Sequence, residues 1–197
     1  MLWEQLLNSV HRDWRGDGRA DDRLDDPAWV RKWMDELRLG DRPLPEEEEL
    51  FGLKRLRERI RRMAQAFVEG RRPEEGDVEA LNRTMAGSKV VRRLAVRDDS
   101  RYEVELLPLD RRWADVEAEI AASFADLLAR GDPSRIRFCD NPNCLWVYYD
   151  ETRNRSKRYC DDKLCGNLMK VRRFRARQKA EAAESRGTSD EHGGTTS

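Results

Sequence analysis

All four cysteines of the chain lie close together in the sequence, between residues 139 and 165. They form two pairs, Cys139 with Cys144 and Cys160 with Cys165, and four residues separate the members of each pair. Two short loops that each supply two thiolates, joined by a hairpin-length connection, form the all-sulfur tetrahedral ligand set that zinc prefers in proteins. The cysteine spacing therefore predicts one structural zinc site whose coordination positions are all taken by the protein.

Three other uses of the cysteines fit the sequence less well. Disulfides form in oxidising compartments, whereas the chain begins Met-Leu-Trp-Glu-Gln and lacks the basic, apolar and cleavage segments of a signal peptide. Redox catalysis typically uses two cysteines that are two residues apart, a spacing that neither pair has. An iron centre with four thiolates is chemically allowed, but the ligand type and the closed geometry favour zinc.

The composition predicts a cytoplasmic protein with a heavily charged surface. Charged residues make up 40% of the 197 residues and hydrophobic residues 38%, so the core is modest for the length of the chain. No run approaches the roughly eighteen consecutive apolar residues of a membrane helix. We therefore expect no membrane partner.

The net charge of zero conceals a strong asymmetry along the chain. Residues 1–134 carry 25 Lys and Arg against 30 Asp and Glu, a net of −5, whereas residues 135–179 carry 13 against 5, a net of +8. Residues 180–197 carry 1 against 4, a net of −3. Four thiolates around one divalent ion leave the cysteine-containing segment at about +6. A compact basic segment beside an acidic body indicates a polyanionic partner.

Apolar periodicity divides the predicted N-terminal domain, residues 1–133, into helices and one hairpin. Helices are predicted at residues 3–12, from Asp26-Pro27 to Gly40, at 46–67, at 78–85 and from Asp110 to Gly131, and two β-rich runs at 91–96 and 102–106, joined by 98–101, predict an antiparallel hairpin. His11 is expected to be a polar residue at a helix end and not a ligand. The predicted fold class is α+β, mainly α.

The longest of these predicted helices carries a run of cations between its apolar positions. They are Lys54, Arg55, Arg57, Arg59, Arg61 and Arg62. Such a run either binds nucleic acid or forms a solvated face that neighbouring glutamates offset. Acidic and basic residues interleave along this helix, which favours the solvated face.

The basic segment, residues 134–183, is predicted to fold as a finger of the treble-clef type. Residues 145–149 are rich in β-forming side chains and predict a strand, residues 157–159 predict the return strand, and 150–156 form the turn between them. Asp161 or Asp162 then begins a helix that contains Cys165 and continues toward Lys179. Residues 184–197 lack apolar side chains and are predicted to be a disordered tail.

Two groups of cations in the finger are candidates for nucleic-acid contacts. The predicted helix carries Lys170, Arg172, Arg173, Arg175, Arg177 and Lys179, and the predicted hairpin adds Arg153, Arg155, Lys157 and Arg158. Cations at this density contact successive phosphates, and a helix can enter the major groove of DNA. The alternatives are a solvated basic helix, a zinc-stabilised module that binds an acidic protein surface, and an RNA-binding finger in which Tyr148 and Tyr149 stack on unpaired bases.

The residue types argue against an enzyme. The chain has two histidines, no phosphate-cradling glycine loop, no serine or cysteine nucleophile with a partnered base, and no open metal site. Carboxylate pairs are too common in a chain this charged to indicate catalysis. A non-enzymatic binding protein is therefore predicted.

Motifs in the finger resemble the CGNR zinc finger family. They are Cys139-Asp-Asn-Pro-Asn-Cys144, the strand from Trp146 to Tyr149, Asp150-Glu-Thr-Arg-Asn-Arg-Ser156, Tyr159-Cys160, Cys165-Gly-Asn167 and Arg173-Phe-Arg-Ala-Arg177. Upstream, the segments Leu6-Leu-Asn-Ser9, Asp26-Pro27 to Trp33, Gly70-Arg-Arg-Pro73 to Leu81-Asn82 and the hairpin resemble the ABATE domain that precedes this finger. Together the two resemblances cover nearly the whole chain.

The resemblance implies a stress-induced bacterial transcription regulator. The family expectation is a finger that binds DNA and an N-terminal domain that senses stress or a ligand, which makes a small-molecule or protein effector of that domain a further expectation. One residue departs from the pattern, because Leu168 stands where the family motif has arginine. All four thiols remain, so this departure concerns the contact of that arginine and not the metal.

Overall fold

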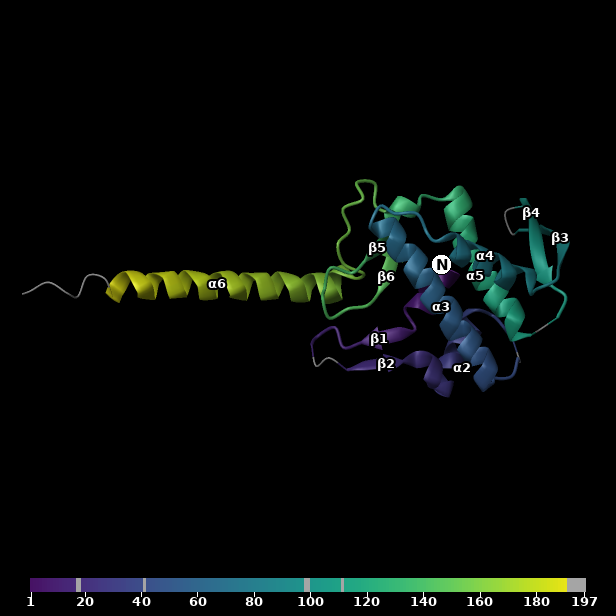
Figure 1. Cartoon of the computed structure of the whole chain (residues 1–197), viewed down its shortest axis with the longest axis horizontal. Coiled ribbons are helices and arrows are strands. Elements are labelled where there is room, and N and C mark those ends of the chain that lie inside the picture. Colours follow the sequence, from purple (N-terminus) through teal and green to yellow (C-terminus); the bar gives the residue numbers. More distant parts are fainter. Residues whose placement is uncertain (17–18, 41, 98–99, 111, 191–197) are drawn as a thin grey trace, which may run out of the picture.

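A mainly helical body, three small antiparallel sheets and one long C-terminal helix make up the part of the chain that the structure describes (Figure 1). The computed structural model describes residues 1–16, 19–40, 42–97, 100–110 and 112–190, with side chains up to residue 182. The prediction of a mainly α fold with small antiparallel elements is confirmed.

The helices of the body begin and end largely where local sequence signals place them. They are α1 (Leu2–Leu7), α2 (Pro27–Glu36), α3 (Glu47–Val68), α4 (Glu75–Ala86) and α5 (Trp113–Arg130). The side chain of Asp26 accepts a hydrogen bond from the backbone N–H of Ala28 at the start of α2, as its residue type predicts. Gly131 follows the last residue of α5 and its N–H bonds the carbonyl of Leu127.

Several helix boundaries differ from the prediction: α2 ends at Glu36 and not near Gly40, and α4 begins at Glu75 and not at residue 78. At two other boundaries, side chains compete for the backbone. The first helix was expected to reach residue 12 but ends at Leu7, where the hydroxyl of Ser9 donates to the carbonyl of Leu6 over 2.7 Å. Asp110 does not cap α5. Instead the carboxylate of Asp115 accepts from the backbone N–H of Arg112 over 2.9 Å, so the helix begins at Trp113.

Each sheet in the described residues is a pair of antiparallel strands. The pairs are β1 (Val10–Arg12) with β2 (Ala20–Asp22), β3 (Val90–Val96) with β4 (Tyr102–Pro108), and β5 (Ile136–Phe138) with β6 (Val147–Tyr149). The predicted hairpin is β3–β4. The prediction that His11 ends a helix is wrong, because His11 lies in β1 opposite Asp21, and its Nδ1 is 3.2 Å from Oδ1 of Asp21.

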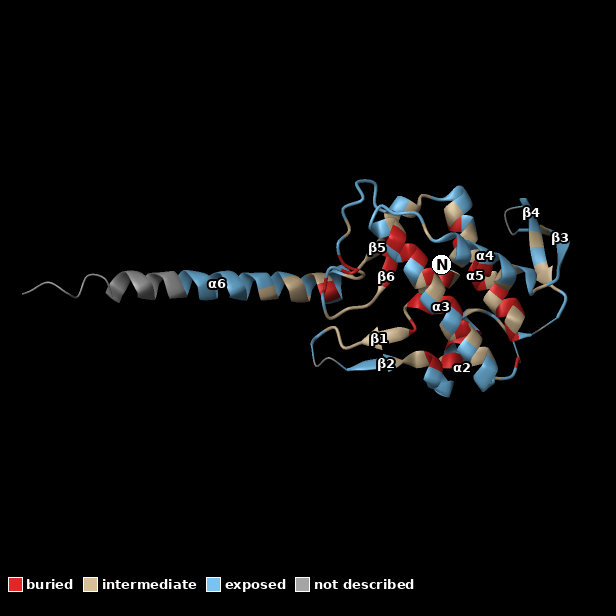
Figure 2. Ribbon diagram, in the orientation of Figure 1, coloured by how far each residue is buried: buried red, intermediate tan, exposed pale blue. Residues whose placement is uncertain are grey.

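One hydrophobic core joins the body to the first strands of the finger. Side chains from α1, α2, α3 and α5 fill it, and Ile136 of β5 and Val147 of β6 belong to the same cluster. Both are fully buried. Figure 2 shows buried segments on α3, on α5 and beside the β5–β6 pair. The packing of β5 and β6 on the helices fixes where the finger begins.

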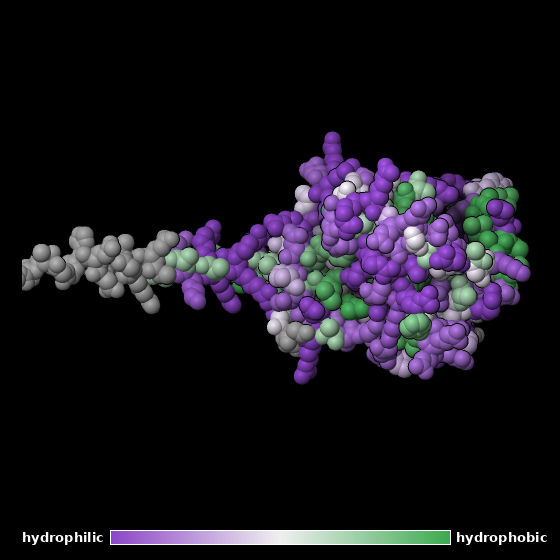
Figure 3. Space-filling model, viewed as in Figure 1, coloured by the Kyte–Doolittle hydropathy of each residue, from purple (hydrophilic) through white to green (hydrophobic). Residues whose placement is uncertain are grey.

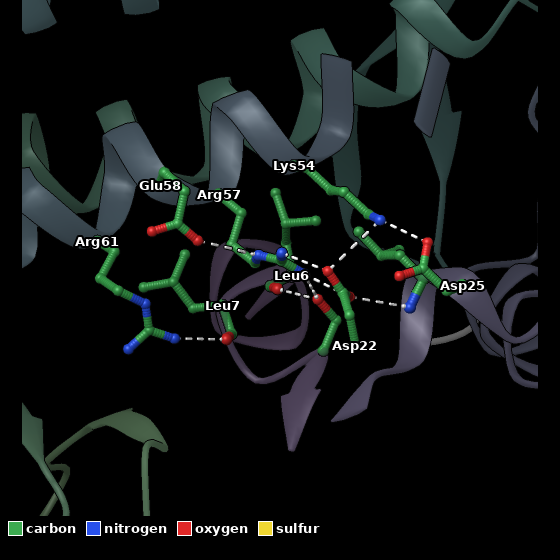
Figure 4. A network of polar contacts seen from close by, with 10 residues as sticks. Leu6, Leu7, Asp22, Asp25, Lys54, Arg57, Glu58 and Arg61 are labelled. Carbon is green, nitrogen blue, oxygen red and sulfur yellow. Dashed lines mark hydrogen bonds and ion pairs between the residues drawn. The ribbon is translucent and has the colours of Figure 1, made fainter. Parts of the chain in front are cut away.

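A buried ion pair attaches β2 to α3 (Figure 4). The guanidinium of Arg57 donates two hydrogen bonds to the carboxylate of Asp22, over 2.7 and 2.6 Å, and a third to the hydroxyl of Ser9. Burial alone would raise the pKa of Asp22, but the hydrogen bonds and charge of Arg57 outweigh burial and lower this pKa. Lys54 pairs with Asp25 and lies 3.7 Å from Asp22.

Two of the α3 arginines, Arg57 and Arg61, therefore do not belong to the solvated face that the sequence predicts, whereas Arg55 and Arg62 are exposed. Arg57 is only 4% exposed. Arg61 donates to the carbonyls of Leu7 and Leu145 over 2.8 and 3.1 Å, and burial lowers its pKa. The interleaved charges predicted a solvated face. This prediction fails for Arg57 and Arg61 because their partners, Asp22 and two backbone carbonyls, are distant in the sequence.

The finger does not contain the predicted hairpin of residues 145–149 with 157–159. Strand β6 pairs with β5 instead. The carboxylate of Asp150 accepts from the backbone N–H groups of Thr152 and Lys157 over 2.9 and 3.1 Å. These bonds fold residues 150–157 into a compact loop, which leaves no extended return strand.

The chain ends in a long helix that extends away from the body (Figure 1). This helix, α6 (Asn167–Asp190), follows the single turn η3 (Asp162–Gly166). Residues 184–190 were predicted to be disordered but are helical, since alanine, glutamate and lysine around residues 179–184 favour helix. The rest of the predicted tail, 191–197, lies outside the described residues. Among the described helices, none is both long and apolar enough to cross a membrane.

Candidate metal centre

Three segments bring the four cysteines together. Cys139 directly follows β5 and Cys144 lies shortly before β6, so the first pair occupies the loop of the β5–β6 hairpin. Cys160 ends the loop after β6, and Cys165 lies in η3. The carboxylate of Asp161 accepts from the N–H groups of residues 163 and 164 over 2.7 and 2.8 Å, which fixes the turn that presents Cys165.

The sulfur positions fit a tetrahedral metal site. All four Sγ atoms lie within 4.8 Å of one another, and the distances from Cys160 to Cys144 and to Cys165 are both 3.8 Å. A tetrahedron with the usual zinc–sulfur distance places its sulfurs roughly 3.8 Å apart. All four cysteines are free thiols, with no disulfide between them. The arrangement fits a divalent ion of zinc size.

The protonation of the thiols also fits a cation site. Hydrogen bonds from the Cys144 and Cys160 thiols hold the pKa of Cys139 far below its ordinary value, at about 2. The bond with Cys139 raises the pKa of Cys144 to about 12, and bonds to both neighbours together with burial raise the pKa of Cys160. A divalent cation would displace the protons that remain on the sulfurs, because the thiolate is the form of cysteine that binds a metal.

A buried asparagine supports the cysteine cluster from behind. The Nδ2 of Asn141 lies 3.4 Å from the sulfur of Cys165 and donates to the backbone carbonyl of Trp14 over 3.0 Å. Asn141 is fully buried, and the Trp14 side chain packs on the small core around Cys165 and Tyr159. The loop between β1 and β2 thus covers the metal site. Neither Asn141 nor Trp14 was predicted to take part.

The same loop also holds the base of α6. The guanidinium of Arg172 donates to the backbone carbonyl of Arg15 over 2.6 Å. Arg172 was predicted to contact nucleic acid, and the structure assigns its side chain to this contact between the body and α6. One part of the N-terminal body therefore touches both the cysteine cluster and the helix that follows it.

Glu4 of α1 and Asn8, which directly follows α1, complete the attachment of the finger to the body. Asn8 pairs with the backbone of Val147 through two hydrogen bonds of 2.9 Å each, in which its amide takes the place of a neighbouring strand. Glu4 accepts from the backbone N–H of Tyr149 over 2.6 Å. These contacts, with those of Arg61, hold the exposed edge of β6 against α1 and α3.

The predicted contact residues of the 150–158 loop have different surroundings. Arg155 pairs with Asp132 over 2.7 Å, and Arg158 pairs with Asp140 over the same distance. The ammonium of Lys157 lies 4.9 Å from the ring centre of Tyr148. Arg153 is exposed and has no ion pair within the described part of the chain. Only Arg153 of this group is therefore fully available to a partner.

The cations of α6 are more accessible. Exposed side chains in this group are Lys170, Arg173, Arg175, Arg177 and Lys179. Arg173 bonds the carbonyl of Met169, and Arg177 lies over the ring of Phe174 at 6.0 Å. The other three have no ion pair among the described residues. Figure 3 shows the hydrophilic surface of this helix projecting from the body.

The tyrosines predicted to stack on RNA bases are not available for stacking. Tyr148 is buried, and its hydroxyl donates to the carbonyl of Lys157 over 2.7 Å. Tyr149 is partly buried, and its hydroxyl accepts from the N–H of Asp132. Leu168, the departure from the family motif, is half-buried at the start of α6.

A shallow cavity of about 470 Å³ lies where α3 and α4 meet the finger. Arg61, Arg62, Asp77, Phe138 and Leu145 are among the residues that line it. A molecule bound in this cavity would touch both the N-terminal domain and the finger. The prediction of a small-molecule or protein effector stays a prediction.

The fold and the site together define a helical domain followed by a four-cysteine finger with a basic C-terminal helix. Residues 1–131 match the ABATE family, whose description is "Putative stress-induced transcription regulator", and residues 135–178 match the CGNR zinc finger. The first match covers more than half of the chain, so the protein belongs to the ABATE family. This confirms the resemblance seen in the sequence. Among curated proteins, no sequence matches this chain.

Proposed function

We propose that the protein is a zinc-dependent, DNA-binding transcription regulator. In this proposal Cys139, Cys144, Cys160 and Cys165 hold one structural Zn²⁺, and α6 contacts the phosphates of duplex DNA. The single observation that carries the proposal is the projection of the exposed cations of α6 away from an otherwise acidic body, directly after the cysteine cluster (Figure 1). Both family descriptions support it, and neither describes an enzyme.

The geometry of α6 suits a groove of DNA. Residues 170–179 rise by about 14 Å along the helix axis, and the major groove accepts an α-helix. Lys170, Arg175 and Lys179 extend into solvent without ion pairs among the described residues, so they can approach phosphates without first breaking an internal contact. Each such contact releases condensed counterions, which makes binding strongly dependent on salt.

The metal has a structural role in this proposal. When bound, Zn²⁺ would link the β5–β6 loop, which supplies Cys139 and Cys144, to the end of the following loop and η3, which supply Cys160 and Cys165. The body holds β6 through Asn8 and holds α6 through Arg172. The direction of α6 therefore depends on the metal link and on the β1–β2 loop together. Arg155, Arg158 and Arg172 serve positioning, and the exposed cations serve contact.

The test is a salt titration of DNA binding with zinc-loaded, full-length protein. Fluorescence anisotropy with a pool of labelled random duplexes gives the slope of log affinity against log salt, which is about −0.9 for each phosphate neutralised. The variant Lys170→Ala, Arg175→Ala, Lys179→Ala should reduce the magnitude of that slope by about 2.7. Arg83→Ala, which removes an exposed cation from α4, should leave the slope unchanged.

Removal of zinc with a chelator should abolish the salt-dependent binding. Addition of zinc should then restore it. Binding that does not respond to salt, or a triple variant with the wild-type slope, would contradict the proposal. A pull-down by an acidic protein without any duplex binding would favour the alternative of a zinc-stabilised interaction module. Preference for single-stranded RNA in a competition would favour the RNA-binding alternative.

A further inference from the structure

The β3–β4 hairpin carries one strongly apolar face that the rest of the chain leaves uncovered. Its register pairs Val90 with Pro108, Leu94 with Val104 and Val96 with Tyr102, and alternation places these positions on one face. The large apolar side chains of this face are between 45% and 72% exposed, and they are Val90, Leu94, Val96, Tyr102, Val104 and Leu106. Figure 3 shows hydrophobic residues gathered over this hairpin. We call this surface the hairpin face.

The opposite face of the hairpin has a different character. Arg93 pairs with Glu105 over 2.7 Å, and Arg97 forms an ion pair with Glu103. The charges of this face are thus neutralised within the hairpin. Ala95, Glu105 and Leu107 on this side are partly buried, and Leu107 lines a cavity with Leu39 and Arg42 of the body. The hairpin is amphipathic, and its apolar side is turned to solvent.

An uncovered face of this kind is unusual for a monomer. A two-stranded sheet is marginally stable in water and gains stability when its hydrophobic face packs on something. Contiguous exposed apolar patches of several hundred Å² on soluble proteins usually mark interaction sites. Pro108 at the base of the face lines a cavity with Leu39 and Arg42, but the body does not cover the rest of the face, because no described residue from 92 to 106 is buried.

We propose that the hairpin face is a homodimer interface, in which two copies of the chain pack their hairpin faces against each other. Such a contact is isologous, so the same patch serves both copies around a two-fold axis. The face would bury on the order of 600 Å² per copy, which reaches the lower limit of about 1,200 Å² in total for a stable specific interface. The proposal goes beyond the DNA-binding function and does not depend on it.

Charge favours a second copy over a charged partner. Only Arg92 among the described side chains of this face is charged, and its long aliphatic stem can cover apolar surface while its guanidinium stays in water. A nucleic acid or an acidic peptide would find no matching set of charges on this face. An identical apolar face offers the complementary surface, and the ion pairs on the far side of the hairpin stay undisturbed.

The position of the hairpin is compatible with the finger in a dimer. The hairpin projects from the end of the body opposite to α6 (Figure 1). Contact between two hairpin faces therefore leaves both copies of α6 uncovered. The dimer would present two cysteine clusters and two basic helices related by the two-fold axis.

Sedimentation equilibrium of the zinc-loaded, full-length protein tests the proposal. At tens of micromolar we expect the mass of two chains for the wild type. The variant Leu94→Lys, Val104→Lys should have the mass of one chain, with its affinity for itself at least about 100-fold weaker. Glu103→Ser, on the opposite face of the same hairpin, should remain a dimer. Both changed residues in the double variant are exposed in the monomer, so its helical circular dichroism should match the wild type.

Three outcomes would overturn the proposal. They are a wild type that stays monomeric up to about 100 µM, a Leu94→Lys, Val104→Lys variant that associates as strongly as the wild type, and a Glu103→Ser variant that dissociates equally. The first would mean that the face serves another molecule or none. The second would place self-association on another surface, and the third would show that the apolar face is not its determinant. DNA binding by α6 is measured separately, so the salt titration can be interpreted whichever of these outcomes is found.

Discussion

The chain contains two hairpins that owe their stability to opposite causes. The strands of β1–β2 are three residues long and contain Val-His-Arg and Ala-Asp-Asp, which are mostly poor β-formers. The strands of β3–β4 are seven residues long and rich in β-branched and aromatic residues. The first hairpin is held by the rest of the molecule through Asp22 and Trp14. The second is held by its own pairing.

This difference indicates different roles for the two hairpins. We expect β1–β2 to position the metal site and α6, and β3–β4 to mediate association between copies of the chain. Through β2, the ion pair with Arg57 anchors the first hairpin to α3, and its loop reaches the cysteine cluster through Asn141 and α6 through Arg172. The second hairpin contacts little besides itself and exposes an apolar face. A change in the first hairpin should therefore alter the metal site, whereas a change in the second should alter only association.

The largest effect is expected from Arg57→Met. The substitution keeps an aliphatic side chain in the core of the interface but leaves Asp22 without its main partner. Removal of one partner from a buried ion pair costs about 3–5 kcal/mol, and we expect about 3 kcal/mol here because Lys54 stays near Asp22. The measurement is the free energy of unfolding from a denaturant titration at neutral pH.

The matched control for that prediction is Arg55→Ala on the same helix. Arg55 is exposed and lies over the ring of Phe51, so its removal should cost no more than about 0.5 kcal/mol. Equal losses in both variants would mean that helix propensity, and not the anchoring of β2, explains the effect. The claim that the ion pair of Arg57 with Asp22 anchors the β1–β2 hairpin to α3 would then fail.

A smaller effect is expected from Asn141→Ala. The variant loses the hydrogen bonds to the Cys165 sulfur and to the Trp14 carbonyl. Groups that support metal ligands in this way typically contribute 10- to 100-fold to metal affinity, and we expect a loss of about 10-fold. Competition with a chromophoric chelator measures the change in zinc affinity. Asn154→Ala, in the exposed part of the 150–158 loop, should bind zinc as the wild type does.

The two hairpins also show why part of the fold was predictable. Alternating β-formers between 91 and 106 predicted β3–β4 because the information is local. No local signal predicts β1–β2. Asp22 is held in its strand by the hydrogen bonds of Arg57, which lies 35 positions later in the sequence. The same limit applies to Arg61, whose partners are carbonyls of Leu7 and Leu145. Long-range polar partners decide these elements, and periodicity does not report them.

The candidate site shows the same division between local and distant information. The spacing of the cysteines predicted that the four sulfurs come together, because each pair needs only a short loop. The prediction of a return strand at 157–159 was wrong, because the carboxylate of Asp150 accepts a hydrogen bond from the backbone N–H of Lys157 and bends the chain into a loop. The sequence analysis assigned Arg172 and Lys170 to the same nucleic-acid contact because both are cations. The structure shows that Arg172 instead donates to the carbonyl of Arg15, which is distant in the sequence. Separating contact residues from positioning residues required the three-dimensional arrangement.

The smallest effect is expected when β3–β4 is shortened. Val91 and Leu107 are cross-strand partners, so Asn-Gly in place of residues 92–106 closes the gap with a two-residue turn. None of the described residues removed is buried, so the free energy of unfolding of the monomer should change by less than about 0.5 kcal/mol, and zinc affinity should not change. The measurements are denaturant titration at low protein concentration and chelator competition.

The same operation on β1–β2 provides the contrast. Arg12 and Ala20 are also cross-strand partners, and Asn-Gly in place of residues 13–19 removes Trp14 and the carbonyl that Arg172 contacts. This variant should lose zinc affinity at least as strongly as Asn141→Ala, because it deletes one partner of Asn141 and the cover of the cysteine cluster. Two excisions of similar design would then have unequal effects on zinc binding. Equal effects would mean that the β1–β2 loop does not support the metal site and that the two hairpins differ only in length.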